Sequence, residues 1–440
     1  MSKAAVAEPA RSATSRSQHG FRIGDWIPRS VNIWVRTMFL PVGYPDSVHS
    51  CYTAVHKWQF VETFLGSMVS VLCSEAMLES LGVGTAAAAG GAVAIQWMLK
   101  DGFGEIGKLL FIHYSAKSFD SHPKSWKMVG EAACLLGSTT QLSTILAPGY
   151  LFLPLASLGY CLRSIHFSIW NATHMTFTRN FANSGNVGDI VAKDDSQMSL
   201  AHLCGMVAGV STLAISHSPW FLFASFFTLA PVHYYCTYKL VNAIQFEVFN
   251  EAKLGLVTRE YVKSGQVMTM LEIQPKEIMF GEWANPKELI PKIVMTRPIS
   301  KVPWLTFSHS HSLCPFTHAL PVGWSLQGER YLLGFSARDQ SVAVVLHIDA
   351  EADDILKAYL HAMKYHAEWS HRKPDMDNAR HLEILAETYE WMGSNFDTFR
   401  TELDIKGWNC DVVFFMDSGH RAEWERRPDI CANQGCAGSE

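Results

Sequence analysis

At 440 residues the chain is longer than one average domain, so its length predicts two or three domains. Hydrophobic residues make up 48% of it and charged residues only 18%, whereas soluble domains carry about a quarter charged residues. This composition indicates a membrane protein or an unusually large apolar core. The net charge of −5 comes without a Lys/Arg stripe, which argues against nucleic acid as a partner. The 10 cysteines contain no C-x-x-C pair, a usage typical of reduced thiols inside the cell.

The chain begins with a segment rich in Ala, Ser and Arg, in which Glu8 is the one acidic residue of the first twenty. Two interpretations stay open: an organelle transit segment, or a disordered tail over residues 1–30. Together with the apolar composition, this segment favours an intracellular membrane, with plastid and mitochondrion as the candidate organelles.

Three long runs in the first half, residues 80–99, 132–162 and 196–238, contain no Asp, Glu, Lys or Arg. Because about 20 mostly apolar residues suffice to cross a bilayer, these runs predict several crossings. We expect two helices in the last run, Leu200–Ser216 and Trp220–Cys236, and a break at Pro148-Gly149 in the middle run. The fold class is therefore mainly α, with a polytopic helical membrane or membrane-embedded domain over residues 31–250.

Small residues favour close helix packing within that domain. Gly205-x-x-x-Gly209 and the Ala86–Ala92 tract both provide faces on which helices approach closely. A large soluble bundle, whose inner helices are apolar all round, is the alternative.

The sequence changes character after residue 250. Residues 251–328 are predicted as an irregular linker region and 329–426 as a small soluble α+β domain, followed by a flexible tail over 427–440. Within that domain we expect strands at Glu329–Ser336, Val342–Ile348 and Asp411–Met416, and helices at Glu351–Ser370 and Asn378–Leu403.

Two Lys-Asp pairs interrupt apolar sequence, Lys100-Asp101 followed by Gly102 and Gly104, and Lys193-Asp194. Lys in a last turn and Gly just after it are typical of a helix end. The alternative is a polar pocket shared by two broken helices, because ionisable groups at membrane depth usually mark a ligand or ion path. The candidate ligand-binding residues are Lys100, Asp101, Gly102, Gly104, Lys193 and Asp194.

Other motifs are less informative. Gly102-x-Gly104-x-x-Gly107 matches a dinucleotide fingerprint by letter, but it follows an Ala-rich helix instead of a strand. His309, His311, Cys314 and His318 have side chains that bind zinc, yet their surroundings are ordinary loop composition, so we expect no metal. His166, His174 and His202 lie on apolar helices and are expected to be core or interfacial residues.

Several motifs resemble the root UVB sensitive family, whose shared domain is associated with vitamin B6 photoprotection and homeostasis. They are Leu40–Val48, Trp58, Gly82-Val-Gly84, Trp97–Gly104, Phe119-Asp120, Pro123-Lys124, Trp126, Phe181-Ala182, Asn186, Asp189, Ala192–Gln197, Gly407-Trp408 and Arg421–Trp424. The resemblance covers residues 36–250 strongly and 405–425 more loosely. Asp195 stands where the family usually has Gly, and Ala87-Ala88-Ala89 where it has Thr-Pro.

The resemblance implies a role in vitamin B6 balance and UV-B responses, membrane association, plastid location for some members, and joint action of two members. It implies no catalytic residue and no established cofactor. We therefore expect a non-enzymatic membrane protein that supports vitamin B6 homeostasis or light-stress responses by transport or sensing, with pyridoxal phosphate as a candidate ligand and membrane lipid as a partner. The alternatives are a membrane scaffold that pairs with a paralogue or with itself, and a pyridoxal-phosphate-dependent enzyme that uses Lys100 or Lys193 as a Schiff base.

Overall fold

The computed structural model describes residues 29–82, 90–183, 185–277, 292–295, 329–336, 341–372, 378–415 and 419–423. The predicted tails before residue 29 and after residue 426 lie outside these ranges, as do the histidine-rich segment 309–318 and most of the Ala86–Ala92 tract.

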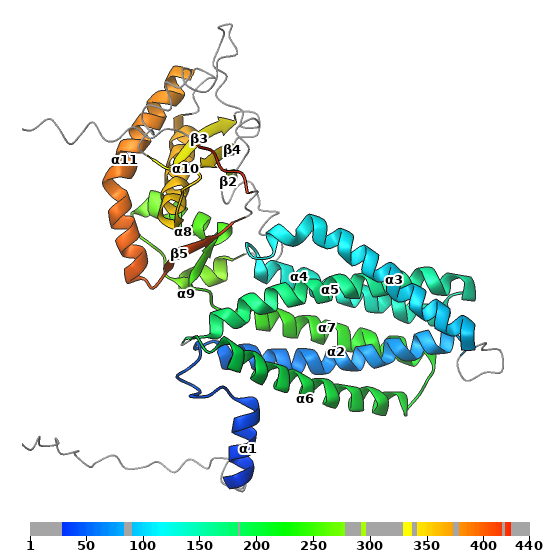
Figure 1. Cartoon of the computed structure of the whole chain (residues 1–440). Helices are drawn as coiled ribbons and strands as arrows, with labels where there is room; N and C mark the ends of the chain where they lie inside the picture. The colour runs from blue at the N-terminus through cyan, green and yellow to red at the C-terminus, as the bar shows by residue number, and fades with distance from the viewer. Residues whose placement is uncertain are drawn as a thin grey trace, which may run out of the picture.

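The first part of the chain folds into long helices (Figure 1). Their bounds are α1 Arg29–Phe39, α2 Tyr52–Ser80, α3 Gly90–Ser115, α4 Pro123–Leu142, α5 Phe152–Phe181, α6 Val187–Leu213 and α7 Pro219–Ala243. At about 1.5 Å per residue, each of α2 to α7 is at least about 30 Å long, the thickness of a bilayer core.

Helices α2, α4, α5 and α7 form the centre of this bundle, while α3 packs on α5 and α6 packs on α2 (Figure 1). Glycines bring the outer helices close. A Cβ on Gly205 would lie 2.3 Å from the carbonyl oxygen of Phe64, and one on Gly209 would lie 2.9 Å from Cβ of Val71. The predicted small face of α6 is therefore used within the chain, against α2.

Two predicted helix boundaries agree with the structure. Helix α4 ends at Leu142, and α5 begins at Phe152, just after Pro148-Gly149. Helix α6 ends at Leu213, and Pro219 occupies the first turn of α7, where its missing N–H costs nothing.

The prediction that Lys100-Asp101-Gly102 and Lys193-Asp194 break helices is wrong. Both pairs lie inside continuous helices, α3 and α6. A glycine inside a helix costs only about 1 kcal/mol, which packing readily offsets. Packing against neighbouring helices therefore decided where these helices run.

The second part of the chain holds two small sheets and four helices among the described residues (Figure 1). The strands are β1 Val248–Asn250, β2 Lys292–Met295, β3 Tyr331–Ser336, β4 Ser341–Leu346 and β5 Asn409–Phe414; the helices are α8 Glu251–Ser264, α9 Met270–Ile273, α10 Ala352–Arg372 and α11 Asn378–Ile405. Strand β1 pairs with β5 in parallel, and β4 lies between β2, its parallel neighbour, and β3, its antiparallel neighbour. The predicted order of two strands, two helices and one strand is present.

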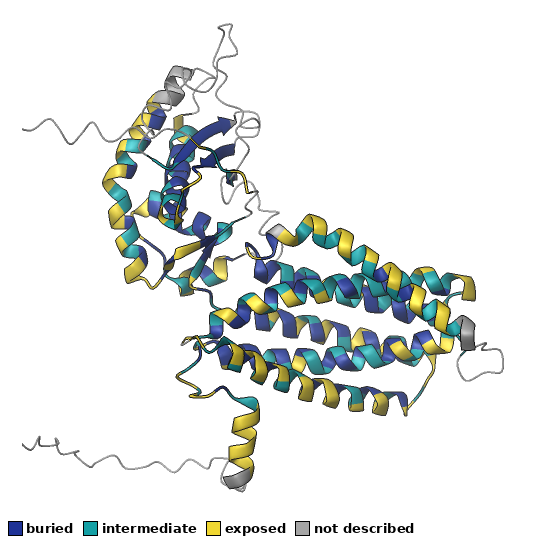
Figure 2. Cartoon of the chain, in the orientation of Figure 1, coloured by how far each residue is buried: buried dark blue, intermediate teal, exposed yellow. Residues whose placement is uncertain are grey.

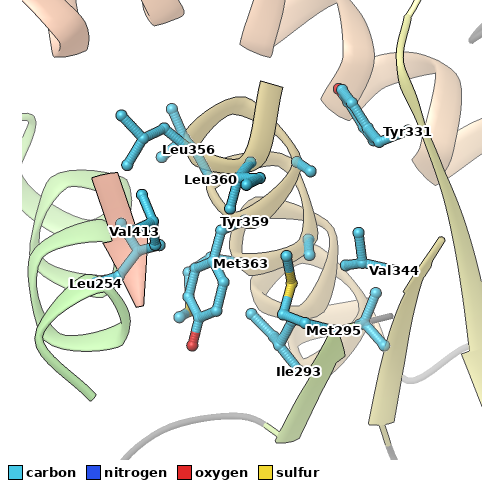
Figure 3. Close-up of a cluster of buried hydrophobic side chains, with 14 of the residues drawn as sticks. Leu254, Ile293, Met295, Tyr331, Val344, Leu356, Tyr359, Leu360, Met363 and Val413 are labelled. Carbon is cyan, nitrogen blue, oxygen red and sulfur yellow. The ribbon is translucent and has the colours of Figure 1, made fainter. Parts of the chain in front are cut away.

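The prediction of an irregular linker over 251–328 is wrong for residues 251–277. Asn250 caps α8 by accepting a hydrogen bond from the backbone N–H of Lys253, at 2.9 Å, and Gly265 ends the helix in a left-handed conformation. Leu254 and Val257 on α8 are fully buried in the core of the second part. Figure 3 shows this core around α10; its labelled side chains are Leu254, Ile293, Met295, Tyr331, Val344, Leu356, Tyr359, Leu360, Met363 and Val413.

The protein is thus mainly helical, with a small sheet part. Among the described helices, α2 alone combines the length and the apolar composition that a membrane crossing needs, and 44% of its most apolar 18-residue window is buried. The several crossings predicted from the charge-free runs thus reduce to one candidate among these helices, which lies outside those runs apart from Ser80. A buried helix of a soluble bundle can have the same composition. The outer surfaces of α3 and α6 are exposed over most of their length (Figure 2).

Candidate functional site

The centre of the bundle contains charged and titratable side chains between its buried apolar clusters. Glu62 on α2, Lys127 and Glu131 on α4, His166 on α5 and His233 on α7 come together there, and we call them the central cluster. Each of the four inner helices contributes at least one member. Glu62, Lys127 and Glu131 are 2–4% exposed, a rare burial for charged residues.

Lys127 lies between the two carboxylates. Its Nζ donates to Oε1 of Glu131 at 2.7 Å and lies 2.9 Å from Oε1 of Glu62. The hydroxyl of Thr237 donates a second hydrogen bond to Oε1 of Glu62, at 2.7 Å. The ammonium group therefore compensates both buried carboxylates at once.

The two histidines lie near different oxygens of the Glu131 carboxylate. Nε2 of His233 lies 3.5 Å from Oε2 of Glu131, and Nδ1 of His166 lies 3.5 Å from Oε1. Both distances are long for a hydrogen bond. Oε2 of Glu131, Nδ1 of His166 and Nδ1 of His233 are buried without a hydrogen-bond partner.

A second buried group surrounds Asp194 on α6, and we call it the Asp194 cluster. Oδ1 accepts from Nε2 of Gln59 at 3.0 Å and lies 3.1 Å from Nε2 of His56, while Oδ2 lies 2.6 Å from Nε2 of His174. Nδ1 of His56 also faces an acceptor, the carbonyl oxygen of Tyr52, at 2.9 Å. Both ring nitrogens of His56 therefore lie within hydrogen-bonding distance of an oxygen atom.

A small cavity lies between the two clusters. Its volume is about 10 Å³, the room that one water molecule needs. Glu62 and Lys127 line it from the central cluster, and Gln59 and His174 from the Asp194 cluster. A water molecule here would join the two groups into one polar track.

The predicted residues Lys100 and Asp101 lie elsewhere. Nζ of Lys100 contacts the Asp101 carboxylate and lies 4.5 Å and 4.4 Å from the ring centres of Trp97 and Tyr160. Gly102 has open space where its side chain would be, whereas a Cβ on Gly104 would lie 2.1 Å from the Tyr160 ring. Gly104 thus serves the packing of α3 on α5.

Lys193 and Asp194 have different surroundings from each other. Lys193 donates from Nζ to the carbonyl oxygen of Thr37, at 2.6 Å, and so ties the last turn of α1 to α6. The two Lys-Asp pairs do not share a pocket. Their contacts on α5, at Tyr160 and His174, are about 21 Å apart along the helix.

Sequence reasoning found Asp194 but missed Glu62, Lys127, Glu131 and His233. One signal was available: Lys127 and Glu131 stand four residues apart, which places them on the same face of a helix. His166 and His174 were expected in the core, and both lie there beside a carboxylate.

The carboxylates of Glu62 and Glu131 and the ring of His233 offer ligand atoms within 4.8 Å of one another, a spacing that suits a metal ion. The Lys127 ammonium already bonds to both carboxylates, so it holds the place of a cation there. The four residues of the histidine-rich segment lie outside the described residues.

A third buried group joins the bundle to the second part of the chain. Nζ of Lys124 donates to Oε2 of Glu277 at 2.6 Å, and Nζ of Lys253 lies 3.5 Å from Oε1. Burial alone would raise the pKa of Glu277, but the ammonium groups of Lys253 and Lys124 outweigh it and hold this pKa below its usual value.

A helical bundle with ionisable clusters in its centre, joined to a small α+β domain, is thus the class of protein that the fold defines. The chain belongs to the root UVB sensitive family: residues 28–265 match the vitamin B6 photo-protection and homoeostasis domain, and residues 311–424 match the C-terminal domain of root UVB sensitive proteins. The family is involved in vitamin B6 homeostasis and the UV-B response.

Three relatives illustrate the match. Protein root UVB sensitive 3 of Arabidopsis thaliana is 26% identical over 90% of this chain and 89% of its own length. Protein root UVB sensitive 2, chloroplastic, of the same plant is 27% identical over 88% of this chain and 84% of its own length. RUS family member 1 of Dictyostelium discoideum is 29% identical over 56% of this chain and 47% of its own length. No solved structure matches the chain significantly.

Proposed function

We propose that the chain is a membrane protein that supports vitamin B6 homeostasis or the light-stress response by carrying or sensing a B6-type molecule, without catalysing a reaction. One observation carries this proposal: the outer helices expose broad apolar faces, while the inner helices bury ionisable clusters. That is the reverse of the usual soluble protein and suits a bundle surrounded by lipid. The charged side chains that α3 does partly expose, Asp101 at 40% and Glu105 at 46%, each pair with a lysine of the same helix.

The outer face of α3 supports the proposal first. Every exposed residue between residues 94 and 110 is apolar, and the larger ones recur every three or four residues: Ile95, Met98, Leu99, Phe103, Ile106, Leu109 and Leu110. The charged residues of this stretch turn inward or pair with one another, as Lys108 does with Glu105. A contiguous apolar face of this length marks a membrane or protein contact.

The outer face of α6 also exposes large apolar residues, although His202 and Ser211 are exposed on the same helix. Leu203, Val207 and Val210 are 56–67% exposed, and no charged residue occurs between residues 196 and 238. Helices α3 and α6 lie at opposite edges of the bundle, so apolar surface flanks it on both sides (Figures 1 and 2).

Helix α1 adds an amphipathic element at one end of the bundle. It exposes Ile33, Trp34 and Met38, and in Figure 1 it runs across the direction of the bundle helices. A helix with an apolar face, a Trp and flanking Arg residues is typical of the membrane interface. We infer that α1 lies on the membrane surface.

Pyridoxal phosphate or a related vitamer is the candidate ligand. The cavity between the two clusters holds one water molecule, whereas pockets for small molecules are about 300 Å³ or more. Entry of such a ligand would therefore require the inner helices to move apart, as carriers do. Lys100 and Lys193, the lysines weighed for a Schiff base, are both engaged by other groups.

The proposed partner is membrane lipid, and the proposed location is an intracellular membrane. A plastid membrane is one candidate, in line with the chloroplastic relative. Pairing with a paralogue or with a second copy would need a surface other than the Gly205–Gly209 face, because that face packs on α2.

Extraction of native membranes tests the membrane part of this proposal. We expect the chain to stay in the pellet after washing with high salt and with alkaline carbonate, and to be released only by detergent. Release by carbonate would overturn it.

Reconstituted liposomes then test the ligand: labelled pyridoxal or pyridoxine should accumulate faster in liposomes that contain the wild-type protein than in empty liposomes. If the protein is a sensor, the vitamer should instead bind to it without crossing the liposome membrane. The absence of both binding and uptake would count against both roles.

A further inference from the structure

We propose that the central cluster is a proton-binding site that holds one exchangeable proton on its pair of carboxylates, Glu62 and Glu131. This inference rests on the proposed function and deepens it, because it names the ion to which carriage or sensing is coupled.

Charge balance is the first argument. The cluster holds two carboxylates and one ammonium group, so with neutral histidines its net charge is −1. All three charged side chains are at most 4% exposed, where uncompensated charge is costly. One added proton makes the cluster neutral.

Hydrogen bonding is the second argument. Oε2 of Glu131 has no donor, although Nε2 of His233 lies 3.5 Å away. Nδ1 of His166 is likewise unpartnered and lies 3.5 Å from Oε1. A proton added on a carboxylate supplies an O–H···N bond and also neutralises the cluster, whereas a change of histidine tautomer would supply an N–H···O bond but leave the net charge at −1.

The Asp194 cluster provides the comparison within the same bundle. There a single buried carboxylate receives hydrogen bonds on both oxygens and faces His56, whose two nitrogens both lie near acceptors. Both oxygens of Asp194 therefore have partners, whereas Oε2 of Glu131 has none among the described residues.

Other groups near Glu131 do not supply the missing charge. The nearest further cation is Arg163 on α5, whose guanidinium donates to the hydroxyls of Ser70 and Ser138. Ser138 is about 10 Å along α4 from Glu131. The titratable groups facing the cluster from the packed helices are Glu62 and Lys127, Cys134, His166 and Arg163, and His233 and Tyr234. Burial raises the pKa of Glu62 and lowers the pKa of His166 to about 4. Burial would also raise the pKa of Glu131, but His166, Lys127 and His233 outweigh it and lower this pKa, so Glu62 is the favoured carrier of the proton.

A divalent metal ion is the competing occupant. With a divalent ion bound and Lys127 still bonded to both carboxylates, the net charge of the cluster would be +1. In a buried site this is less favourable than a net charge of zero. The geometry therefore favours the proton.

Thermal unfolding of the purified full chain in detergent, between about pH 7 and pH 9, tests the proposal. In this range the carboxyls and histidines of the unfolded chain are deprotonated. If the folded state keeps one proton, the equilibrium constant for folding should therefore fall about tenfold per pH unit until that proton is lost. Glu131→Gln mimics the neutral state and should remove this one-proton share, and it should leave the loss toward pH 9 that buried cysteines with raised pKa values cause in both proteins. The matched control Asp195→Asn, at an exposed position on α6, should keep the one-proton share.

The same pH dependence in wild type and Glu131→Gln would overturn the proposal, as would a stoichiometric divalent metal in the purified wild type. If Glu131→Gln fails to fold, infrared titration of the wild type decides: a carboxylic-acid band should disappear across the same pH range, and its absence would contradict the proposal. Because these measurements are made in detergent and without a vitamer, they can fail or succeed independently of the proposed membrane role.

Discussion

Lys124 and Glu277 form an ion pair of 2.6 Å across the junction between the bundle and the α+β domain, with both side chains buried. Lys124 lies one turn before Lys127 on α4, so one helix carries both the junction pair and part of the central cluster. A change in that cluster can therefore act on the α+β domain through α4.

Glu277→Gln should destabilise the protein by about 3–5 kcal/mol, because it leaves the buried ammonium groups of Lys124 and Lys253 without a countercharge. Thermal unfolding measures the loss. Glu390→Gln, at an exposed position of α11, is the control and should change little. Since the pKa of Glu277 is lowered, its contribution is full above the usual pKa of a glutamate and is lost as the pH falls below it. Equal stability of the two variants would contradict this assignment.

Two glycines of one motif should respond differently to alanine. Gly104→Ala places a methyl group 2.1 Å from the Tyr160 ring and should cost about 1–3 kcal/mol. Gly102→Ala meets nothing within 4 Å and should stabilise the helix by up to about 1 kcal/mol. If Gly102→Ala instead abolished function without loss of protein, Gly102 would be a ligand contact, as the sequence predicts.

Asp194→Ala should cost about 3–5 kcal/mol, since it removes the acceptor shared by His56, His174 and Gln59. The neighbouring Asp195→Ala serves as the control, because its side chain is exposed. Protein abundance in the membrane fraction and the unfolding midpoint report the difference. Similar behaviour of the two variants would argue against a buried Asp194 cluster.

His361 should make the α+β domain sensitive to acid. It is fully buried on α10, where Nδ1 contacts the Tyr331 hydroxyl at 3.0 Å, and burial lowers its pKa to about 3. The unfolded chain takes up this proton near pH 6.5, so stability is full above that pH and falls as the pH drops toward 3. His361→Gln should flatten the decline in a pH series of unfolding midpoints, whereas the exposed His371→Gln should not.

The sequence predicted the features that follow from periodicity. Charge-free runs located α6 and α7, and alternating or helical patterns located β3, β4, α10, α11 and β5 to within a few residues. The sequence could not show which charged residues contact one another in the fold. Glu62, Lys127 and His233 are isolated charges or histidines on separate helices, and only tertiary packing brings them together. For the same reason Lys100-Asp101 was taken for a break, although its partners lie on the neighbouring turn and on α5.

The central claim, that the outer faces of α3 and α6 contact lipid, is tested most directly by cysteine accessibility in native membranes. The probes are Ile106→Cys on α3 and Val207→Cys on α6, with Ile405→Cys at the end of α11 as the water-exposed control; these positions are 57%, 67% and 75% exposed. All 10 native cysteines, of which Cys204 is exposed, are replaced by serine or alanine throughout, so that the introduced cysteine is the one labelled. A water-soluble maleimide should label only the α11 cysteine in intact membranes and all three after denaturation. Equal labelling of all three in intact membranes would contradict the claim.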